Sequence, residues 1–266
     1  MKLKMDVVDV FTHERFKGNA AAVIITKEWL ADELMQSIAI ENNLSETAYV
    51  LQESDSHYQI RWFSPMMEVD FCGHATLAAS YVIFSANPEL EIIYLFAEAV
   101  GEMCIRKTSD GYIQMAFPNR KPWPVDDVPD ELLTGLSILP SSVLLNNQAY
   151  FAVYEKEEDV LNVRQNRDVL KTLAPYDVVV TAKSTQYDFI SRYFWPATGG
   201  DEDPVTGSIH AGLAPYWSEQ LGKDELRAYQ ASKRGGMIHC HVSDDRVLVS
   251  GQAVHYLEGY IQVSSH

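Results

Sequence analysis

The chain has 266 residues, of which 47% are hydrophobic and 22% are charged, as in a globular protein of one large or two small domains. Its formal net charge of −16 excludes a nucleic-acid partner, because no basic stripe is present to neutralise phosphates. The three cysteines are too widely spaced for a disulfide framework or a CxxC metal site. Neither a signal peptide nor an uncharged run of about 20 residues is present, so we expect a cytoplasmic protein with no membrane partner.

The first part of the chain alternates between short strands and one helix. The turn signal Gly18-Asn19 separates two valine-rich or alanine-rich runs and predicts a hairpin. Apolar residues then recur at helical spacing before Asn42-Asn43. These patterns predict strands at 3–11, 20–25, 47–51 and 58–63, and a helix at 32–40.

The segment 73–86 predicts a helix with almost no polar face. A helix that is apolar all round in a globular protein is a buried one, so strands must supply a wall around it. Further strands are predicted at 91–96, 102–106 and 112–117.

A proline-rich segment at 118–129 predicts a linker, and the pattern repeats beyond it. A second, mostly apolar helix is expected at 207–220, where Pro215 requires a kink or an early end. Three or four strands should close the chain between 226 and 263. The other predicted elements of this half are strands at 142–145, 149–154, 177–181 and 188–194, and short helices at 157–163 and 167–173.

The segments 71–79 and 203–211 are alike, because each is a polar turn that opens into a run of small apolar residues. Gly73 and Gly207 are separated by almost half the chain. We therefore predict an α+β fold of two pseudo-repeated halves, each a curved, mostly antiparallel sheet or barrel around a central buried helix. The halves are expected at 1–118, completed by a C-terminal strand at about 254–266, and at 119–253, with a ligand held in the cleft between them.

The two predicted helix starts favour an anionic ligand. A helix N-terminus carries unpaired N–H groups and partial positive charge, so it holds a carboxylate well. Glycine at 73 and 207 lets a ligand approach the backbone closely. We expect a small anionic carboxylate substrate at this site.

Proton transfer at such a site needs a titratable group, and the candidates are Glu46, His74 and Asp203. Glu46 enters a strand among apolar neighbours, and its burial there would raise its pKa toward neutrality. Each residue also has a structural interpretation. Glu46 can cap a turn, His74 can cap a helix, Asp203 can form an Asp-Pro turn, and Ser208 can be an N-cap.

Two further groups of residues are weaker candidates. Cys72 is either a thiol acid/base or an inert buried cysteine. His239 and His241 would share one face of a strand, but no third ligand is evident, so no metal site is predicted.

An ordered series of short motifs extends over the whole chain. In the first half these are Asp9–Phe11, Phe16–Val23, Asn43–Ala48, Arg61–Pro65, Glu68–Asp70 and Cys72–Thr76. In the second half they are Glu202–Ser208, His210, Ser232–Gly236 and Gly251–Val254. With these motifs the chain resembles the PhzF-like family of phenazine-biosynthesis isomerases, within the diaminopimelate-epimerase-like fold. Ala20 and Ile209 depart from the family, which usually has proline and alanine there.

The resemblance implies a cofactor-free isomerase that shifts a proton between carbons of a substrate like trans-2,3-dihydro-3-hydroxyanthranilate. Glu46 would remove the proton and redeliver it. The other catalytic residues implied are His74, Asp203 and Ser208, which would position the substrate, and the substrate-binding residues are Gly73, Gly207, Asn19 and His210. The resemblance also implies a homodimer and no metal.

Two alternatives remain from the sequence. The first is an amino-acid epimerase or racemase that uses a carboxylate or Cys72. Related epimerases use two cysteines, and Cys72 has no cysteine counterpart near Gly207. The second is a non-catalytic protein that binds a small molecule.

Overall fold

The computed structural model describes residues 1–263, and these form two compact units. Unit 1 comprises Met1–Ala116 and the chain from Ser250 onward, and unit 2 comprises Phe117–Val249. The predicted last strand, at about 254–266, extends past the described residues at 264–266. Across residues 1–263, no helix has both the length and the apolar character needed to cross a membrane.

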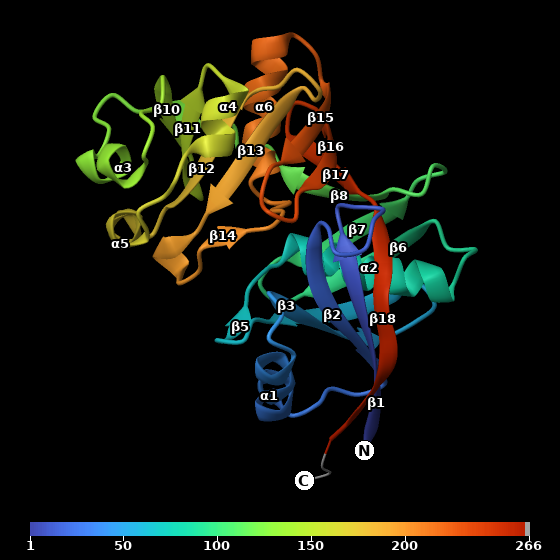
Figure 1. The fold of residues 1–266 in the computed structure, drawn as a ribbon. Helices are drawn as coiled ribbons and strands as arrows, with labels where there is room; N and C mark the ends of the chain where they lie inside the picture. Colours follow the sequence, from blue (N-terminus) through green and yellow to red (C-terminus); the bar gives the residue numbers. More distant parts are fainter. Residues whose placement is uncertain (264–266) are drawn as a thin grey trace. The chain divides into compact units, whose positions relative to one another are not determined.

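Unit 1 is one mixed sheet with a helix against each face (Figure 1). Its strands pair in the order β18–β1–β2–β3–β4–β6–β7–β8, and the short β5 also pairs with β4. Only β2–β3 and β4–β6 are parallel among these pairs. The elements are β1 (Lys2–Val10), β2 (Asn19–Thr26), α1 (Asp32–Asn42), β3 (Glu46–Gln52), β4 (His57–Phe63), β5 (Glu68–Val69), α2 (Gly73–Ala86), β6 (Ile92–Ala97), β7 (Gly101–Lys107), β8 (Ile113–Pro118) and β18 (Ala253–Gln262).

Alternation along the strands explains why two helices are needed. Ile24 and Tyr49 face α1 and pack with Met35 and Ile38 of that helix. Side chains one position away point to the opposite face, which α2 covers. Within α2, all residues are buried except Tyr81, Ser85 and Ala86, as its uniformly apolar sequence predicts.

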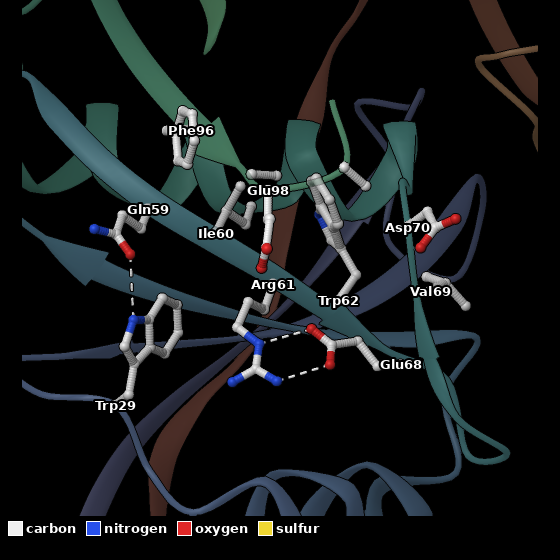
Figure 2. A pocket seen from close by; sticks show the side chains of 12 residues that line it. Trp29, Gln59, Ile60, Arg61, Trp62, Glu68, Val69, Asp70, Phe96 and Glu98 are labelled. Carbon is white, nitrogen blue, oxygen red and sulfur yellow. Dashed lines mark hydrogen bonds and ion pairs between the residues drawn. The ribbon is translucent and has the colours of Figure 1, made fainter. Parts of the chain in front are cut away.

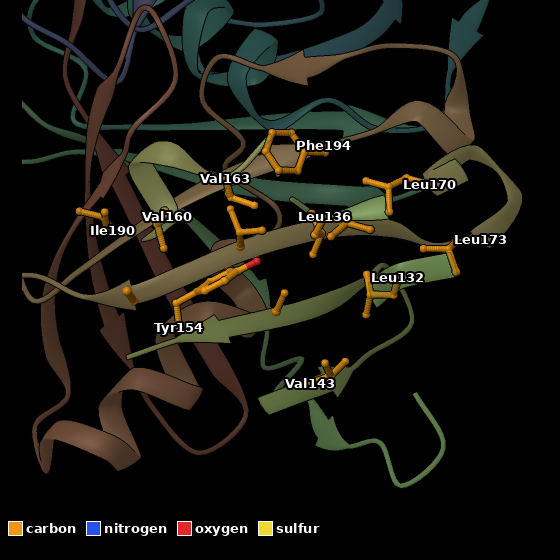
Figure 3. Packing of buried hydrophobic residues seen from close by; sticks show 14 residues of the cluster. Leu132, Leu136, Val143, Tyr154, Val160, Val163, Leu170, Leu173, Ile190 and Phe194 are labelled. Carbon is orange, nitrogen blue, oxygen red and sulfur yellow. The ribbon is translucent and has the colours of Figure 1, made fainter. Parts of the chain in front are cut away.

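Unit 2 repeats this plan. Its pairs run β9–β10–β11–β12–β13–β15–β16, and the short β14 also pairs with β13. A cluster that includes Leu132, Tyr154, Val160 and Phe194 fills one face (Figure 3). The elements are β9 (Trp123–Pro124), α3 (Asp130–Gly135), β10 (Ser142–Leu145), β11 (Ala149–Tyr154), α4 (Glu157–Asn162), α5 (Arg167–Leu170), η1 (Lys171–Leu173), β12 (Asp177–Lys183), β13 (Phe189–Phe194), η2 (Pro196–Thr198), β14 (Glu202–Asp203), α6 (His210–Leu221), β15 (Glu225–Gln230), β16 (Gly236–Val242) and β17 (Arg246–Gly251).

The strand pairing confirms the predicted internal repeat. The strand pairs that follow β1 in unit 1 and β10 in unit 2 have the same sequence of directions. The first three pairs are antiparallel, parallel and antiparallel. The fourth strand of each series then pairs with a short antiparallel strand (β5 or β14) and with a parallel strand (β6 or β15). The parallel pair aligns Ala21 with Glu46 in unit 1 and Ala149 with Asp177 in unit 2. Glu46 and Asp177 therefore hold equivalent places, each as the first residue of its strand.

Helix α6 differs from its prediction in two ways. It begins at His210, not at residue 207, because residues 207–209 form a turn with bonds such as Ala211 N–H to the Ser208 carbonyl. Ser208 is therefore not the N-cap. Pro215 does not end the helix either. The Ala211 carbonyl that Pro215 leaves without a helical partner accepts the Arg120 N–H at 3.0 Å.

Candidate active site

Glu46 and His74 form a buried ion pair in unit 1. The Glu46 carboxylate oxygen Oε2 lies 2.9 Å from His74 Nε2, and the two side chains are 16% and 8% exposed. Glu46 starts β3, where alternation places Glu46, Ala48 and Val50 on the face opposite Tyr49. His74 lies in the first turn of α2, which covers that face, so the fold brings the two predicted residues together.

Two more side chains surround the His74 ring. Cys72 Sγ lies 3.4 Å and Asn19 Nδ2 lies 3.3 Å from His74 Nδ1. The Ser45 hydroxyl donates to Asn19 Oδ1 at 3.4 Å, which turns the amide nitrogen toward the ring. Asn19, predicted to bind substrate, therefore contacts His74, and Cys72 belongs to the same cluster.

The electrostatics of the pair favour the charged forms. Burial alone would raise the pKa of Glu46, but the charge and hydrogen bond of His74 outweigh it and lower that pKa below 4.5. Burial would lower the pKa of His74, but the neighbouring Cys72 and Glu46 raise it well above 6.5. The prediction that burial raises the pKa of Glu46 toward neutrality is therefore wrong, because it left out His74.

Cys72 behaves differently. Burial, with a contribution from the Glu46 charge, raises the pKa of its thiol to about 11. The thiol is thus protonated at neutral pH and is a poor base.

The start of α2 has no side-chain cap. Cys72 occupies the N-cap position without a side-chain hydrogen bond of the capping kind. The Thr76 hydroxyl instead turns back to the Cys72 carbonyl at 2.7 Å. Gly73 is the first residue of α2 and directly precedes His74, so the ion pair involves the first turn of this helix.

In unit 2, Asp203 lies in a turn that a buried glutamine holds. The Thr206 hydroxyl donates to Asp203 Oδ2. Gln230 is fully buried, donates to the Asp203 carbonyl at 2.8 Å and accepts the Thr206 N–H at 2.9 Å. The Ser232 hydroxyl donates to the Pro204 carbonyl at 2.7 Å. No local pattern in the sequence points to Gln230, because it acts on this turn from the end of a separate strand, β15.

His210 lies inside unit 2. Its ring is fully buried, donates from Nδ1 to the Thr206 carbonyl at 2.8 Å and packs near Phe189. Burial lowers its pKa to about 4, so it is neutral at physiological pH. The bond from Nδ1 holds the turn before Gly207 and Ser208, and the substrate contact of His210 stays a prediction.

Ser208 belongs to a series of polar side chains linked by hydrogen bonds, and the other members of this series lie outside the sequence motifs. Gln148 Nε2 donates to Ser208 Oγ at 3.0 Å and to Tyr193 Oη at 3.1 Å, and Tyr193 donates to Asp177 Oδ2 at 2.8 Å. The repeat offered a signal for Asp177, because it holds the place in unit 2 that Glu46 holds in unit 1. No sequence motif or repeat position pointed to Gln148 or Tyr193.

Two groups of side chains could hold a metal ion. In Glu46, Cys72 and His74, the possible ligand atoms all lie within 4.8 Å of one another, as they do in Asp6, His255 and Glu258. In the first group, the ion pair already uses Glu46 Oε2 and His74 Nε2, so a metal would have to replace it. Within residues 1–263, His239 and His241 belong to no such group.

A pocket of about 620 Å³ lies elsewhere in unit 1, where β4 changes partner from β6 to β5 (Figure 2). Trp29, Arg61, Trp62 and Glu68 are among its lining residues. None of the predicted site residues lines it, so its volume gives no measure of the proposed site.

Comparisons with known proteins agree with this architecture. The sequence pattern of the PhzC-PhzF family, described as "Phenazine biosynthesis-like protein", matches residues 8–259. An uncharacterized isomerase of Pseudomonas aeruginosa is 42% identical over 263 residues, which cover 99% of this chain and 100% of that protein. The crystal structure of a PhzF-family phenazine biosynthesis protein from Enterococcus faecalis has a TM-score of 0.94 and 38% identity, covering 99% of this chain and 100% of that one.

A more distant structure bears on the fold alone. A hydroxyproline epimerase from Agrobacterium vitis has a TM-score of 0.62 at 9% identity, covering 98% of this chain and 92% of that one. The predicted diaminopimelate-epimerase-like fold is thus confirmed. The chain belongs to the PhzC-PhzF family of phenazine biosynthesis-like proteins, and it is an enzyme of the isomerase class.

Proposed function

We propose that this isomerase works without a cofactor and moves a proton between two carbons of a small carboxylated substrate. The proposed substrate class is that of trans-2,3-dihydro-3-hydroxyanthranilate, and Glu46 is the proposed acid/base. The observation that carries the proposal is the buried contact of 2.9 Å between Glu46 Oε2 and His74 Nε2 at the uncapped start of α2.

The charged pair suits a proton shuttle. Because the pKa of Glu46 is lowered, its carboxylate is ionised at neutral pH and can take a proton from carbon. The C–H electron pair moves into the conjugated system of the substrate. The resulting carboxyl group is a strong enough acid to return the same proton to a different carbon, so atoms and electrons balance without a redox partner.

The remaining roles are part of the same proposal. Gly73 and the first N–H groups of α2 would contact the substrate carboxylate, and Asn19, beside the His74 ring, would be a further substrate contact. Asp203, Ser208 and Gly207 keep the roles that the resemblance implies, with Asp203 and Ser208 positioning the substrate and Gly207 binding it. A homodimer and a cytoplasmic location remain predictions from the sequence.

The test is proton NMR in D₂O with trans-2,3-dihydro-3-hydroxyanthranilate. Wild type should produce the isomer, and Glu46→Gln should lower the rate by roughly 10²- to 10⁴-fold, the usual contribution of a positioned acid/base. Glu41→Gln, on the exposed side of α1, is the matched control and should leave the rate unchanged. Full turnover by Glu46→Gln would refute the shuttle role.

A second candidate is an amino-acid epimerase or racemase in which Cys72 exchanges the proton. The distance of 3.4 Å between Cys72 Sγ and His74 Nδ1 favours it. The raised pKa of the thiol counts against it, because the reactive thiolate is scarce at neutral pH. Loss of activity in Cys72→Ala, with deuterium entering an amino acid in wild type only, would favour this candidate over the first.

A further inference from the structure

We infer that Gln148, itself held by Tyr193 and Asp177, is a positioning residue that fixes the Ser208 hydroxyl as a hydrogen-bond donor to the substrate carboxylate. The inference rests on the proposed function, in which Ser208 contacts the substrate. All four residues belong to unit 2.

The chain of hydrogen bonds begins at a buried carboxylate. Tyr193 Oη donates to Asp177 Oδ2 at 2.8 Å, and these two residues are 4% and 8% exposed. Burial and the Asp177 charge raise the pKa of Tyr193 well above its usual value, so the phenol keeps its hydrogen. A phenol has one hydrogen, so toward any other neighbour Tyr193 Oη can only accept.

This constraint sets the direction of the amide. The end of the Gln148 side chain lies 3.1 Å from Tyr193 Oη and 3.0 Å from Ser208 Oγ. Since Tyr193 can only accept there, the group that faces it is the NH₂ group of Gln148, not its oxygen. The two hydrogens of this NH₂ group go to Tyr193 and to Ser208. Ser208 Oγ therefore accepts, and its own hydrogen is left to be donated.

The backbone of Gln148 is also held in place. Asn146 is 3% exposed, and its Oδ1 accepts the N–H groups of Gln148 at 2.8 Å and Ala149 at 3.0 Å. The Gln148 carbonyl accepts the Asp177 N–H at 3.2 Å. The side chain therefore extends from a fixed turn, which limits the entropy lost when it orders Ser208.

Ser208 is only partly buried, so a ligand can reach it. In the described part of the chain, its hydroxyl makes no other hydrogen bond. It directly follows Gly207, just as His74 directly follows Gly73, so the two residues hold matching places in the repeat. After it accepts from Gln148, the Ser208 hydroxyl still has its hydrogen to donate outward, and a carboxylate, which can only accept, suits that donor.

The orientation can be tested without a substrate by NMR of protein labelled with ¹⁵N-glutamine. The side-chain signals of Gln148 are assigned by their loss in Gln148→Met. Tyr193→Phe keeps the ring and should shift one of the two Gln148 hydrogens, and Ser208→Ala should shift the other. If both variants move the same hydrogen, or neither moves one, the inference is wrong.

A second experiment tests the functional consequence by measuring kcat and KM for trans-2,3-dihydro-3-hydroxyanthranilate. Gln148→Met and Ser208→Ala should each raise KM roughly tenfold with little change in kcat, as expected when a hydrogen bond to a charged group is lost from substrate and transition state alike. The double variant should be no worse than Ser208→Ala, because Gln148 acts through Ser208. Gln186→Met, at an exposed position, is the matched control.

An additive loss in the double variant, or a fall in kcat with unchanged KM, would show that Gln148 acts by another route and would overturn the inference. Failure of the proposed function looks different. In that case turnover is absent or does not depend on Glu46, while the NMR experiment still decides whether Gln148 orients Ser208.

Discussion

Arg61 and Glu68 form a two-point ion pair that ties the middle of β4 to β5, with Nε 2.6 Å from Oε1 and Nη2 2.7 Å from Oε2 (Figure 2). The repeat contains the same device, because Arg192 and Glu202 pair through the same atoms at 2.7 Å and 2.9 Å. Strands β5 and β14 have two residues each, too few to be fixed by backbone bonds alone. Strand β5 is followed shortly by Cys72, a weaker candidate from the sequence, and β14 contains Asp203, so each ion pair lies close in the chain to a candidate site residue.

Replacing Arg61 by lysine should test this device. Lysine keeps the charge but cannot make the planar two-point contact with Glu68. We expect the free energy of unfolding to fall by about 1 kcal/mol, a modest loss because the pair is partly exposed. Urea unfolding measures it. Arg106→Lys, at an exposed position, is the control, and an equal effect of both variants would contradict the prediction.

The Glu46–His74 pair should make the free energy of unfolding fall both when the pH is lowered and when it is raised. The folded-state pKa of Glu46 is lowered, so its contribution is present above 4.5 and is lost as pH falls through the folded value. The folded-state pKa of His74 is raised, so its contribution is complete below 6.5 and is lost as pH rises through the folded value. The pair therefore stabilises the fold most between pH 4.5 and 6.5.

The reference for this prediction is the double variant Glu46→Gln/His74→Gln, which has no titrating pair. The difference in the free energy of unfolding between wild type and this variant, measured by urea unfolding across pH, should be largest in that window. A difference that stays constant across pH would mean that the two groups do not interact in the folded protein.

Removing His74 should reverse the direction in which the pKa of the Glu46 carboxyl group is shifted. Burial raises the pKa of this carboxyl, and only its neighbours, His74 above all, hold it below 4.5. In His74→Gln the midpoint should therefore move above 4.5, as followed by ¹³C NMR of the Glu46 carboxyl carbon. His13→Gln, at an exposed histidine, should leave the midpoint in place. A midpoint that His74→Gln does not move would rule out the ion pair as the cause.

The three cysteines should differ sharply in reactivity. Cys104 is exposed, while Cys72 and Cys240 are buried. With a pKa of about 11, less than about one part in a thousand of Cys72 is thiolate at neutral pH. Iodoacetamide followed by mass spectrometry should label Cys104 at least about 100-fold faster than Cys72. Fast labelling of Cys72 would indicate a thiolate and would revive the epimerase alternative.

The elements with a strong local pattern could be predicted from the sequence. Helix α2, with its apolar circumference, was predicted at the bounds that the structure gives, and so were strands β10 and β11. The two-residue strands β5, β9 and β14 were not predicted, because their pairing depends on a partner strand and not on their own residues. The proline-rich linker in fact contains β9, which pairs with β10 through Pro124 and Trp123.

The candidate site likewise has residues that could be predicted from the sequence and residues that could not. The motifs pointed to Glu46 and His74, and the fold brings them together from two separate elements, β3 and α2. The sign of the Glu46 pKa shift could not be read from its neighbours in sequence, because His74 decides it from another element. Gln148 and Tyr193 could not be identified from the sequence for the same reason, since neither belongs to a motif and both act through contacts that only the folded chain creates.

The position of β18 has a consequence for the order of assembly during synthesis. This strand pairs with β1 from Lys2↔Gln262 to Val10↔Ala253, so the first and last stretches of the chain lie together in unit 1. Unit 2 is one uninterrupted stretch, Phe117–Val249, and it leaves the ribosome before β18 does. Unit 2 can therefore complete its sheet before unit 1 does, in contrast to the usual order in which the N-terminal domain matures first. The half that carries Glu46 and His74 acquires β18 only after all of unit 2 has been synthesised, so a chain truncated before that strand cannot complete this half.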